Sequence, residues 1–161
     1  MFQGTTRGRG RRWPLALFLS WLPVAAAADA IVVIDETGET LGSFSLAPGE
    51  RWCLSWHHSV AGFEVNDCFV FDPPHLVLDS SHQPDFAAGL GHIAGRGVQV
   101  SDGAGGYRIE SIDEPVPGNR LRLRVGSRTV DHRIEHAGGS IALSEIAPHH
   151  AVEIRLVASA P

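Results

Sequence analysis

The 161-residue sequence contains no lysine, and it has two cysteines, one methionine and one tyrosine. All 13 basic residues are therefore arginines, and against 18 acidic residues they leave a formal net charge of −5 at pH 7. An acidic chain in which no basic stripe is recognised is a poor partner for nucleic acid or for an anionic membrane surface. The four tryptophans and a hydrophobic content of 43% exclude a disordered chain.

The first 30 residues have the pattern of a secretory signal. Four arginines precede residue 13, residues 13–28 are almost wholly apolar, and small residues fill positions 25–30. This order of basic, apolar and small residues is typical of a signal peptide. The apolar run is shorter than the roughly 20 residues that span a membrane, although a retained anchor is the alternative. We expect a signal peptide over residues 1–30, cleaved after Ala28 or after Ala30, and a periplasmic or secreted protein with no transmembrane segment.

Residues 31–161 consist of short β-type runs separated by Gly, Pro, Asp and Asn clusters, with no sustained helical periodicity. This pattern predicts a single all-β domain, an antiparallel β-sandwich or a small barrel-like sandwich. The strongest strands are expected over 51–58 and 63–71. Further strands are expected over 31–34, 41–46, 76–78, 98–101, 107–112, 120–125, 128–134, 141–143 and 151–157.

The two cysteines are symmetric about a loop at 59–62. A hairpin with this loop closes His58 against Phe63 and places Cys53 directly opposite Cys68. A non-hydrogen-bonded antiparallel pair has the short Cα separation that a disulfide needs, and an exported chain meets an oxidising compartment. We expect a cross-strand disulfide, with two reduced, buried cysteines as the alternative.

The same register sorts the side chains of this hairpin into two faces. One face also carries Asp67, opposite Leu54, and a carboxylate there must find a partner or stay protonated. The other face sets His57 across from Glu64, as a solvated ion pair of small energy. The face that contains Asp67 is predicted to be the core face, with Trp52, Leu54, Trp56, His58, Phe63, Val65, Phe69 and Phe71.

A second hairpin is expected from the alternating residues 121–125 and 128–134, which flank Gly126 and Ser127. A two-residue loop that begins with Gly favours such a turn. The implied register sets Leu121 against His132, so that His132 lies at the edge of an apolar face. We interpret His132 as a packed histidine, with a functional role as the alternative.

Nine histidines raise the question of a metal site, for which His57, His58, His82 and His92 are the weak candidates. No diagnostic metal-ligand spacing is present, and adjacent His57 and His58 point to opposite faces of a strand. Ser59 with His58 and an aspartate supplies the residue types of a catalytic triad, but no G-x-S-x-G motif accompanies them. We therefore expect neither a resident metal or cofactor nor an enzyme.

Residues 80–97 are predicted to form a long loop that contains four glycines. Asp85 and Phe86 could anchor it. Its backbone amides could hold an anion or a substrate carboxylate, or the segment could be an Ω-loop that closes one end of the sandwich.

Several of these residues together resemble a known family. Trp56, the His58-Ser59-Val60 triplet, Asp67, Phe69 and the segment 86–90 are similar to the DUF1850 family of small exported bacterial proteins of unknown function. The resemblance covers about residues 50–155, and Gly91 departs from the proline common after Leu90. The resemblance implies a signal peptide and a gene that often lies next to the genes of TAXI-type TRAP transporter components. It also implies that the cysteine pair is a trait of a subgroup of the family.

The family pattern and the residue-level interpretation meet on one hairpin and the loop after it. Asp67 is expected to accept hydrogen bonds from Ser59, from His58 or from backbone amides of the loop over 85–90. We therefore expect a non-catalytic accessory or binding domain, whose partner is a periplasmic solute receptor or transporter subunit. The alternative is a metal or small-ligand site near His58, Asp67, Asp85 and His92. The expected structural and binding motif consists of His58, Ser59, Asp67, Asp85, Phe86, Gly89 and Leu90.

Overall fold

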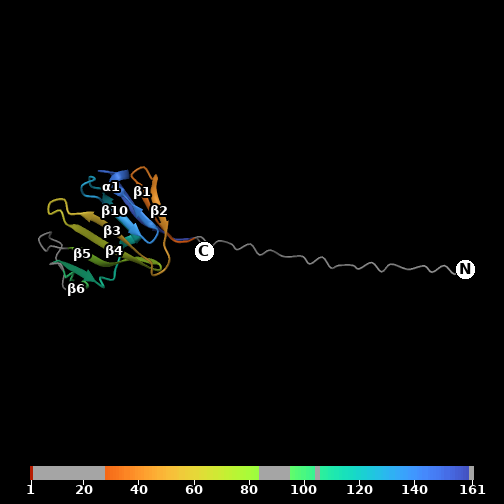
Figure 1. Ribbon diagram of the computed structural model, residues 1–161, viewed down its shortest axis with the longest axis horizontal. Coiled ribbons are helices and arrows are strands. Elements are labelled where there is room, and N and C mark those ends of the chain that lie inside the picture. Colours follow the sequence, from red (N-terminus) through yellow and green to blue (C-terminus); the bar gives the residue numbers. More distant parts are fainter. Residues whose placement is uncertain (2–27, 84–94, 104–105, 160–161) are drawn as a thin grey trace.

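The computed structural model describes Met1 and residues 28–83, 95–103 and 106–159, and it shows two packed antiparallel sheets (Figure 1). The predicted all-β sandwich is confirmed. The smaller sheet has the order β2-β1-β12-β9, with β1 at Ala30–Asp35, β2 at Thr40–Ser45, β9 at Arg120–Arg124 and β12 at Ala151–Val157.

The larger sheet has the order β11-β10-β3-β4-β5-β7-β6, and the short strand β8 also pairs with β5. Its strands are β3 at Arg51–His57, β4 at Glu64–Asp72, β5 at His75–Gln83, β6 at Val98–Ser101, β7 at Tyr107–Glu110, β8 at Glu114–Pro115, β10 at Arg133–His136 and β11 at Gly139–Ile141.

Aromatic rings join the two sheets at the centre of the core. Trp52 of β3 stacks on Phe69 of β4 with ring centroids 4.6 Å apart. Phe44 of β2 meets Trp52 edge-on at 6.1 Å and stacks on His136 of β10 at 4.1 Å. A smaller apolar cluster of Tyr107, Ile109 and Ile112 packs on Leu78. The inner face of the larger sheet is therefore apolar along most of its width.

The hairpin of β3 and β4 has the predicted register. Cys53 pairs with Cys68, and Leu54 with Asp67. The disulfide is formed, with the two Cα atoms 4.0 Å apart. His58 closes the hairpin by donating its backbone N–H to the Phe63 carbonyl at 2.8 Å. Sequence symmetry about the loop was sufficient to fix this ribbon, because both strands are local and alternate with period two.

The second predicted hairpin is wrong, because β9 pairs with β12 in the smaller sheet and β10 pairs with β3 in the larger one. The chain crosses between the sheets at Gly126. A Cβ atom on Gly126 would lie 2.6 Å from the Cβ of Val130. The backbone at position 126 is therefore closer to Val130 than a residue with a side chain would permit. Asp131 then turns with a φ of 53° before β10 begins.

Three further expectations need correction. A short helix, α1 (Leu143–Ile146), follows β11, although no helix was predicted and a strand was expected over 141–143. Four residues are too few to produce a helical period in the sequence. The expected strand over 128–134 begins only at Arg133. Strand β5 continues to Gln83, so the first part of the expected loop over 80–97 is strand.

The predicted signal peptide lies largely outside the described residues, which exclude 2–27. Within the described ranges, no helix has the length and apolar character needed to cross a membrane.

Candidate functional site

Asp67 lies on the inner face of β4, between Leu54 of β3 and Ser81 of β5. Its Oδ1 accepts a hydrogen bond from the buried Ser81 hydroxyl at 2.7 Å. Burial raises the pKa of the Asp67 carboxyl, while the Ser81 hydrogen bond and the charge of Arg96 oppose the rise without cancelling it. The carboxylate is therefore held by a neighbouring strand, and by a residue that the sequence interpretation assigned to a loop.

Replacing Asp67 by Asn is expected to raise the melting temperature at neutral pH by a few degrees. Because the folded state favours the protonated carboxyl, the stability that this group contributes is present below the ordinary pKa of 3.8 and is lost as the pH rises through the folded-state pKa. The amide keeps an acceptor for Ser81 and removes the charge. Melting curves from about pH 4 to about pH 8 check this. Asp72→Asn, at the exposed end of β4, is the matched control, and equal melting temperatures for Asp67→Asn and wild type at about pH 8 would contradict it.

His58 and Ser59 do not contact Asp67. The His58 ring stacks on Phe63 at 5.1 Å, and its Nδ1 accepts the backbone N–H of Ala61 at 3.1 Å. Ser59 is exposed, and His58 lies four strand positions beyond the Leu54–Asp67 pair, about 13 Å along the ribbon. The expectation that Ser59 or His58 supplies the hydrogen bond to Asp67 is wrong, and the three residues do not form a catalytic triad.

The remaining predicted motif residues lie in the segment 84–94, outside the described residues. The expected contact between Asp67 and that loop therefore stays a prediction. The residues concerned are Asp85, Phe86, Gly89 and Leu90, together with the weak metal candidate His92.

The other two metal candidates have separate surroundings. His57 pairs in register with Glu64 on the outer face of the larger sheet. His82 of β5 places its Nε2 3.1 Å from Oδ2 of Asp102. Within residues 28–83, 95–103 and 106–159, no three His, Cys, Asp or Glu side chains gather in an arrangement that could hold a metal ion.

The outer face of the larger sheet contains a groove of about 580 Å³. The Cys53–Cys68 disulfide lies in its lining, and polar side chains from four strands surround it. The sequence did not reveal this groove, because its residues adjoin only once the order β3-β4-β5-β7 is known. The lining residues are Arg51, Cys53, Asn66, Cys68, Asp79, Ser80, His82, Arg108, Glu110 and Ser111.

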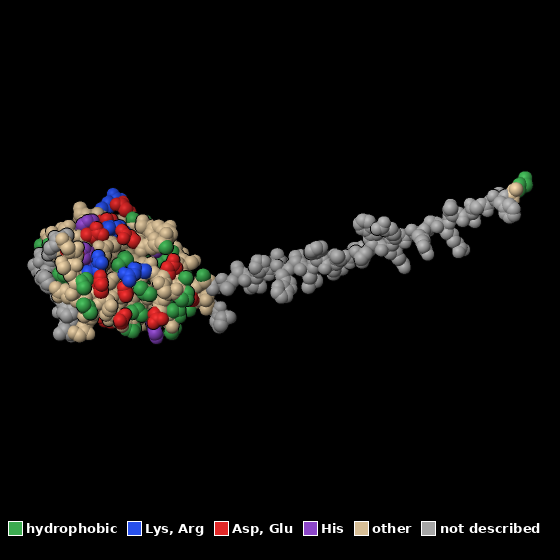
Figure 2. All heavy atoms as spheres, turned by 60° about the horizontal axis from the view of Figure 1, so that its bottom comes forward, with side chains coloured by type: hydrophobic (Ala, Val, Ile, Leu, Met, Phe, Trp, Pro, Cys, Tyr) green, Lys and Arg blue, Asp and Glu red, His purple; other side chains and the backbone are tan. Residues whose placement is uncertain are grey.

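The charged groups of the groove are paired with one another. Arg51 forms an ion pair with Asp79, and Arg108 lies 3.5 Å from Glu110. Both arginine side chains are about half exposed, and exposed pairs of this kind contribute at most about 1 kcal/mol each. Figure 2 shows the same mixture on the face that it views, where arginine and acidic side chains lie next to one another. A ligand could therefore exchange partners with these groups at little cost.

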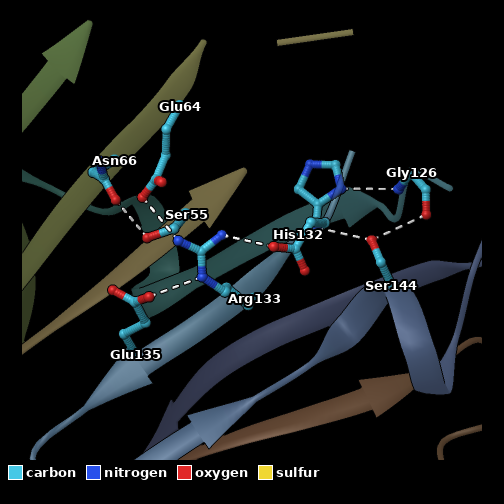
Figure 3. Close-up of polar contacts among 9 residues, drawn as sticks. Ser55, Glu64, Asn66, Gly126, His132, Arg133, Glu135 and Ser144 are labelled. Carbon is cyan, nitrogen blue, oxygen red and sulfur yellow. Dashed lines mark hydrogen bonds and ion pairs between the residues drawn. The ribbon is translucent and has the colours of Figure 1, made fainter. Parts of the chain in front are cut away.

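Beside the groove, Arg133 of β10 binds three carboxylates at once (Figure 3). Its Nη2 donates to Glu64 at 2.8 Å, its Nη1 to Asp131 at 2.9 Å and its Nε to Glu135 at 2.8 Å. Burial by itself lowers the pKa of the guanidinium, but the three carboxylates outweigh it and raise the pKa. Arg133 thus ties β10 and the turn before it to β4, across β3.

His132 is the buried histidine of the described chain, and its polar contacts close the crossing between the sheets (Figure 3). Its Nδ1 accepts the Gly126 N–H at 2.9 Å, and its own backbone N–H donates to the Ser144 hydroxyl at 2.8 Å. The ring stacks on Trp56 with centroids 5.9 Å apart. Burial lowers the pKa of His132, and the charge of Asp131 opposes this only in part. The packed role expected for His132 is confirmed, although its partners differ from the predicted ones.

Acidification is expected to weaken the fold through His132. Because its folded-state pKa is depressed, the neutral ring contributes stability above the ordinary pKa of 6.5, and this contribution is lost as the pH falls through 6.5 towards the folded-state pKa. Protonation would also remove the acceptor for Gly126. Melting temperatures at about pH 7.5 and about pH 5 should differ less in His132→Asn than in wild type. The exposed His75→Asn is the control, and an equal pH dependence in His132→Asn and wild type would contradict the assignment.

Comparison with known proteins identifies a family. A family model described as "Domain of unknown function (DUF1850)" matches residues 53–143, more than half of the chain, from the first cysteine of the disulfide to the start of α1. Neither the curated proteins nor the solved structures contain a match. The matched range includes every groove-lining residue except Arg51, which lies two positions before it.

Proposed function

Because the chain belongs to the DUF1850 family, whose function is unknown, we propose from the geometry of the site that it is an exported, non-catalytic accessory or binding domain. The observation that carries this proposal is the groove over the Cys53–Cys68 disulfide. It offers guanidinium, carboxylate, imidazole and hydroxyl groups from a rigid sheet, which suits recognition of a polar partner surface.

The local chemistry near the hairpin loop supports binding in preference to catalysis. The Nδ1 of His58 accepts loop amides, and it is therefore occupied as a hydrogen-bond acceptor. The hydroxyl of Ser81 is the donor to Asp67, which leaves that carboxylate engaged within the sheet. A serine nucleophile that is activated by a histidine base needs a hydrogen bond between its hydroxyl and the imidazole. His58 forms no such hydrogen bond with Ser59 or with Ser81.

The proposed export agrees with the disulfide, since such bonds persist in oxidising compartments. Cleavage is expected after Ala28 in preference to Ala30. The Asp29 carbonyl accepts the Leu46 N–H at 2.8 Å, its Oδ1 accepts the Ser159 N–H at 2.8 Å, and Ala30 is already part of β1. Mass spectrometry of protein recovered from the periplasm should show Asp29 as the first residue. A mature chain that begins at Ile31 would contradict this choice.

The resemblance to DUF1850 proteins supplies the proposed context, a TAXI-type TRAP transport system, and the proposed partner, its periplasmic solute receptor. Copurification tests both. The receptor should be recovered with wild type and with Arg128→Ser, whose side chain lies outside the groove lining, and at least about ten-fold less with Arg51→Ser/Arg108→Ser. Equal recovery with all three proteins, or recovery with none, would refute the groove as the binding surface.

One observation favours the alternative of a metal or small-ligand site that includes Asp67, with Asp85 and His92 as its further expected residues and without the distant His58. Asp67 is a desolvated carboxylate with a raised pKa, and such groups gather at functional sites. Elemental analysis of protein purified without a histidine tag decides between the two. A stoichiometric metal that is lost in Asp67→Ala would favour the alternative.

A further inference from the structure

Strand β9 forms one edge of the smaller sheet and carries a row of cations. Arg120, Arg122 and Arg124 alternate with two leucines, and Arg155 of β12 pairs in register with Arg120. No basic stripe was expected from the sequence, and at this edge that expectation is wrong. We refer to these four arginines as the β9 stripe.

The β9 stripe is not neutralised as the other described arginines are. Arg51, Arg96, Arg108, Arg128 and Arg133 each lie within 3.5 Å of a carboxylate oxygen. In the stripe, Arg120, Arg122 and Arg155 share Glu153 at 3.9, 3.6 and 3.8 Å, and the Arg122 side chain is 79% exposed. Among the residues that the structure describes, Glu153 is therefore the one carboxylate within 4.0 Å of any of these four guanidinium groups.

Two other acidic residues, Asp35 and Glu36, line the same surface hollow as Arg122, and both accept hydrogen bonds from the backbone. Glu36 accepts the Ala151 N–H at 3.1 Å. Asp35 accepts the N–H groups of Thr37 and Glu39 at 2.8 and 2.9 Å. Within the described part of the chain, four arginines thus stand against three carboxylates, which leaves one positive charge in surplus.

The backbone N–H and C=O groups of two of these arginines point toward the open edge of the sheet. Just beyond the strand, the Val125 N–H donates to the His150 carbonyl at 2.9 Å, in continuation of the register with β12. At its start, the Arg120 N–H donates to Pro117 and not to β12. Along an antiparallel strand, successive residues point their backbone N–H and C=O groups alternately toward the paired strand and away from it. Since Val125 points toward β12, the N–H and C=O groups of Arg122 and Arg124 point away from β12.

We propose that β9 accepts an extended acidic segment of a partner protein by strand addition. The segment pairs its backbone with Arg122 and Arg124, and its carboxylates at alternate positions face the β9 stripe. The residues between them are apolar and extend the inner face formed by Leu121 and Leu123, which are half-buried at this edge.

Charge identifies the occupant. In a second copy of the chain, β9 against β9 would bring arginine against arginine, and like charges on opposed strands are destabilising. Charged residues commonly protect an edge from neutral strands, but the same charges attract an acidic one. An anionic lipid surface would engage the guanidinium groups without using the outward backbone groups.

The test uses a capped six-residue peptide of alternating Glu and Val, labelled for fluorescence anisotropy. Wild type and Arg128→Ser should bind it equally, and Arg122→Ser/Arg124→Ser should bind at least about ten-fold more weakly while its melting temperature stays close to that of wild type. N-methylation of one alternate set of peptide amides should abolish binding, while methylation of the other set should be tolerated, because only one edge of an added strand pairs. The Arg122 and Arg124 amides should become protected from hydrogen exchange.

Three outcomes would overturn the proposal. Equal binding of both N-methylated peptides would show attraction of charge alone. Binding to vesicles that contain anionic phospholipid, without binding to the peptide, would assign the stripe to a lipid surface. Absence of binding to both probes at low salt would mean that the stripe only protects the edge of the sheet from pairing with other strands.

Discussion

Replacing both Cys53 and Cys68 by serine is expected to lower the free energy of unfolding by about 3 kcal/mol. The bond joins residues 15 positions apart, and removing it restores the conformational freedom of that loop in the unfolded chain. For a domain of this size, the melting temperature should fall by about 10 °C. Urea and thermal unfolding of the double variant and wild type give both quantities.

Reduction supplies the control for this prediction. Wild type in excess reductant should show the stability of Cys53→Ser/Cys68→Ser, and the double variant should not respond to reductant. A loss of less than about 1 kcal/mol would show that the disulfide contributes little to the fold. The register of β3 and β4 would then depend on the packing of their inner face.

Replacing Arg133 by Met is expected to lower the free energy of unfolding by about 2 kcal/mol, between the values for exposed and for buried ion pairs. The change leaves the carboxylates of Glu64, Asp131 and Glu135 close together with no shared cation. Arg133→Lys should recover only part of the loss, because an ammonium group cannot donate along the three directions that the guanidinium uses. Urea unfolding measures both variants.

A double-mutant cycle isolates the contribution of the pairs. With Glu64→Gln already present, Arg133→Met should cost measurably less than in wild type, because one of the three repelling charges is gone. Equal costs in the two backgrounds would mean that Arg133 acts through packing of its aliphatic stem and not through charge.

The parts of the fold that the sequence predicted are those in which local signals agree. The β3–β4 ribbon was recovered in register because its alternation, its loop and its cysteine pair all favour one pairing. The segment 120–134 carries equally good hairpin signals, yet its two strands join different sheets. Pairing with β12 and β3 is a non-local choice that depends on the whole core, and a local pattern does not contain it.

The candidate site shows the same division. Asp67 was identified from the sequence as a residue that needed a partner, but Ser81 was missed because β5 was expected to end before it. The groove requires the order of four strands, which no single segment encodes. The alternating arginines of β9 were visible in the sequence, and they became a stripe only when β9 was placed at an edge beside Arg155.

Site-specific photo-crosslinking in the periplasm tests the groove most directly. A photoreactive residue replaces Ser111, an exposed residue of the groove lining, or Ala137, an exposed residue outside that lining. The solute receptor should crosslink from position 111 and not from position 137, and the adduct should disappear in the Arg51→Ser/Arg108→Ser background. Adducts of equal yield from both positions, or none from position 111, would contradict the assignment of the groove as the binding surface.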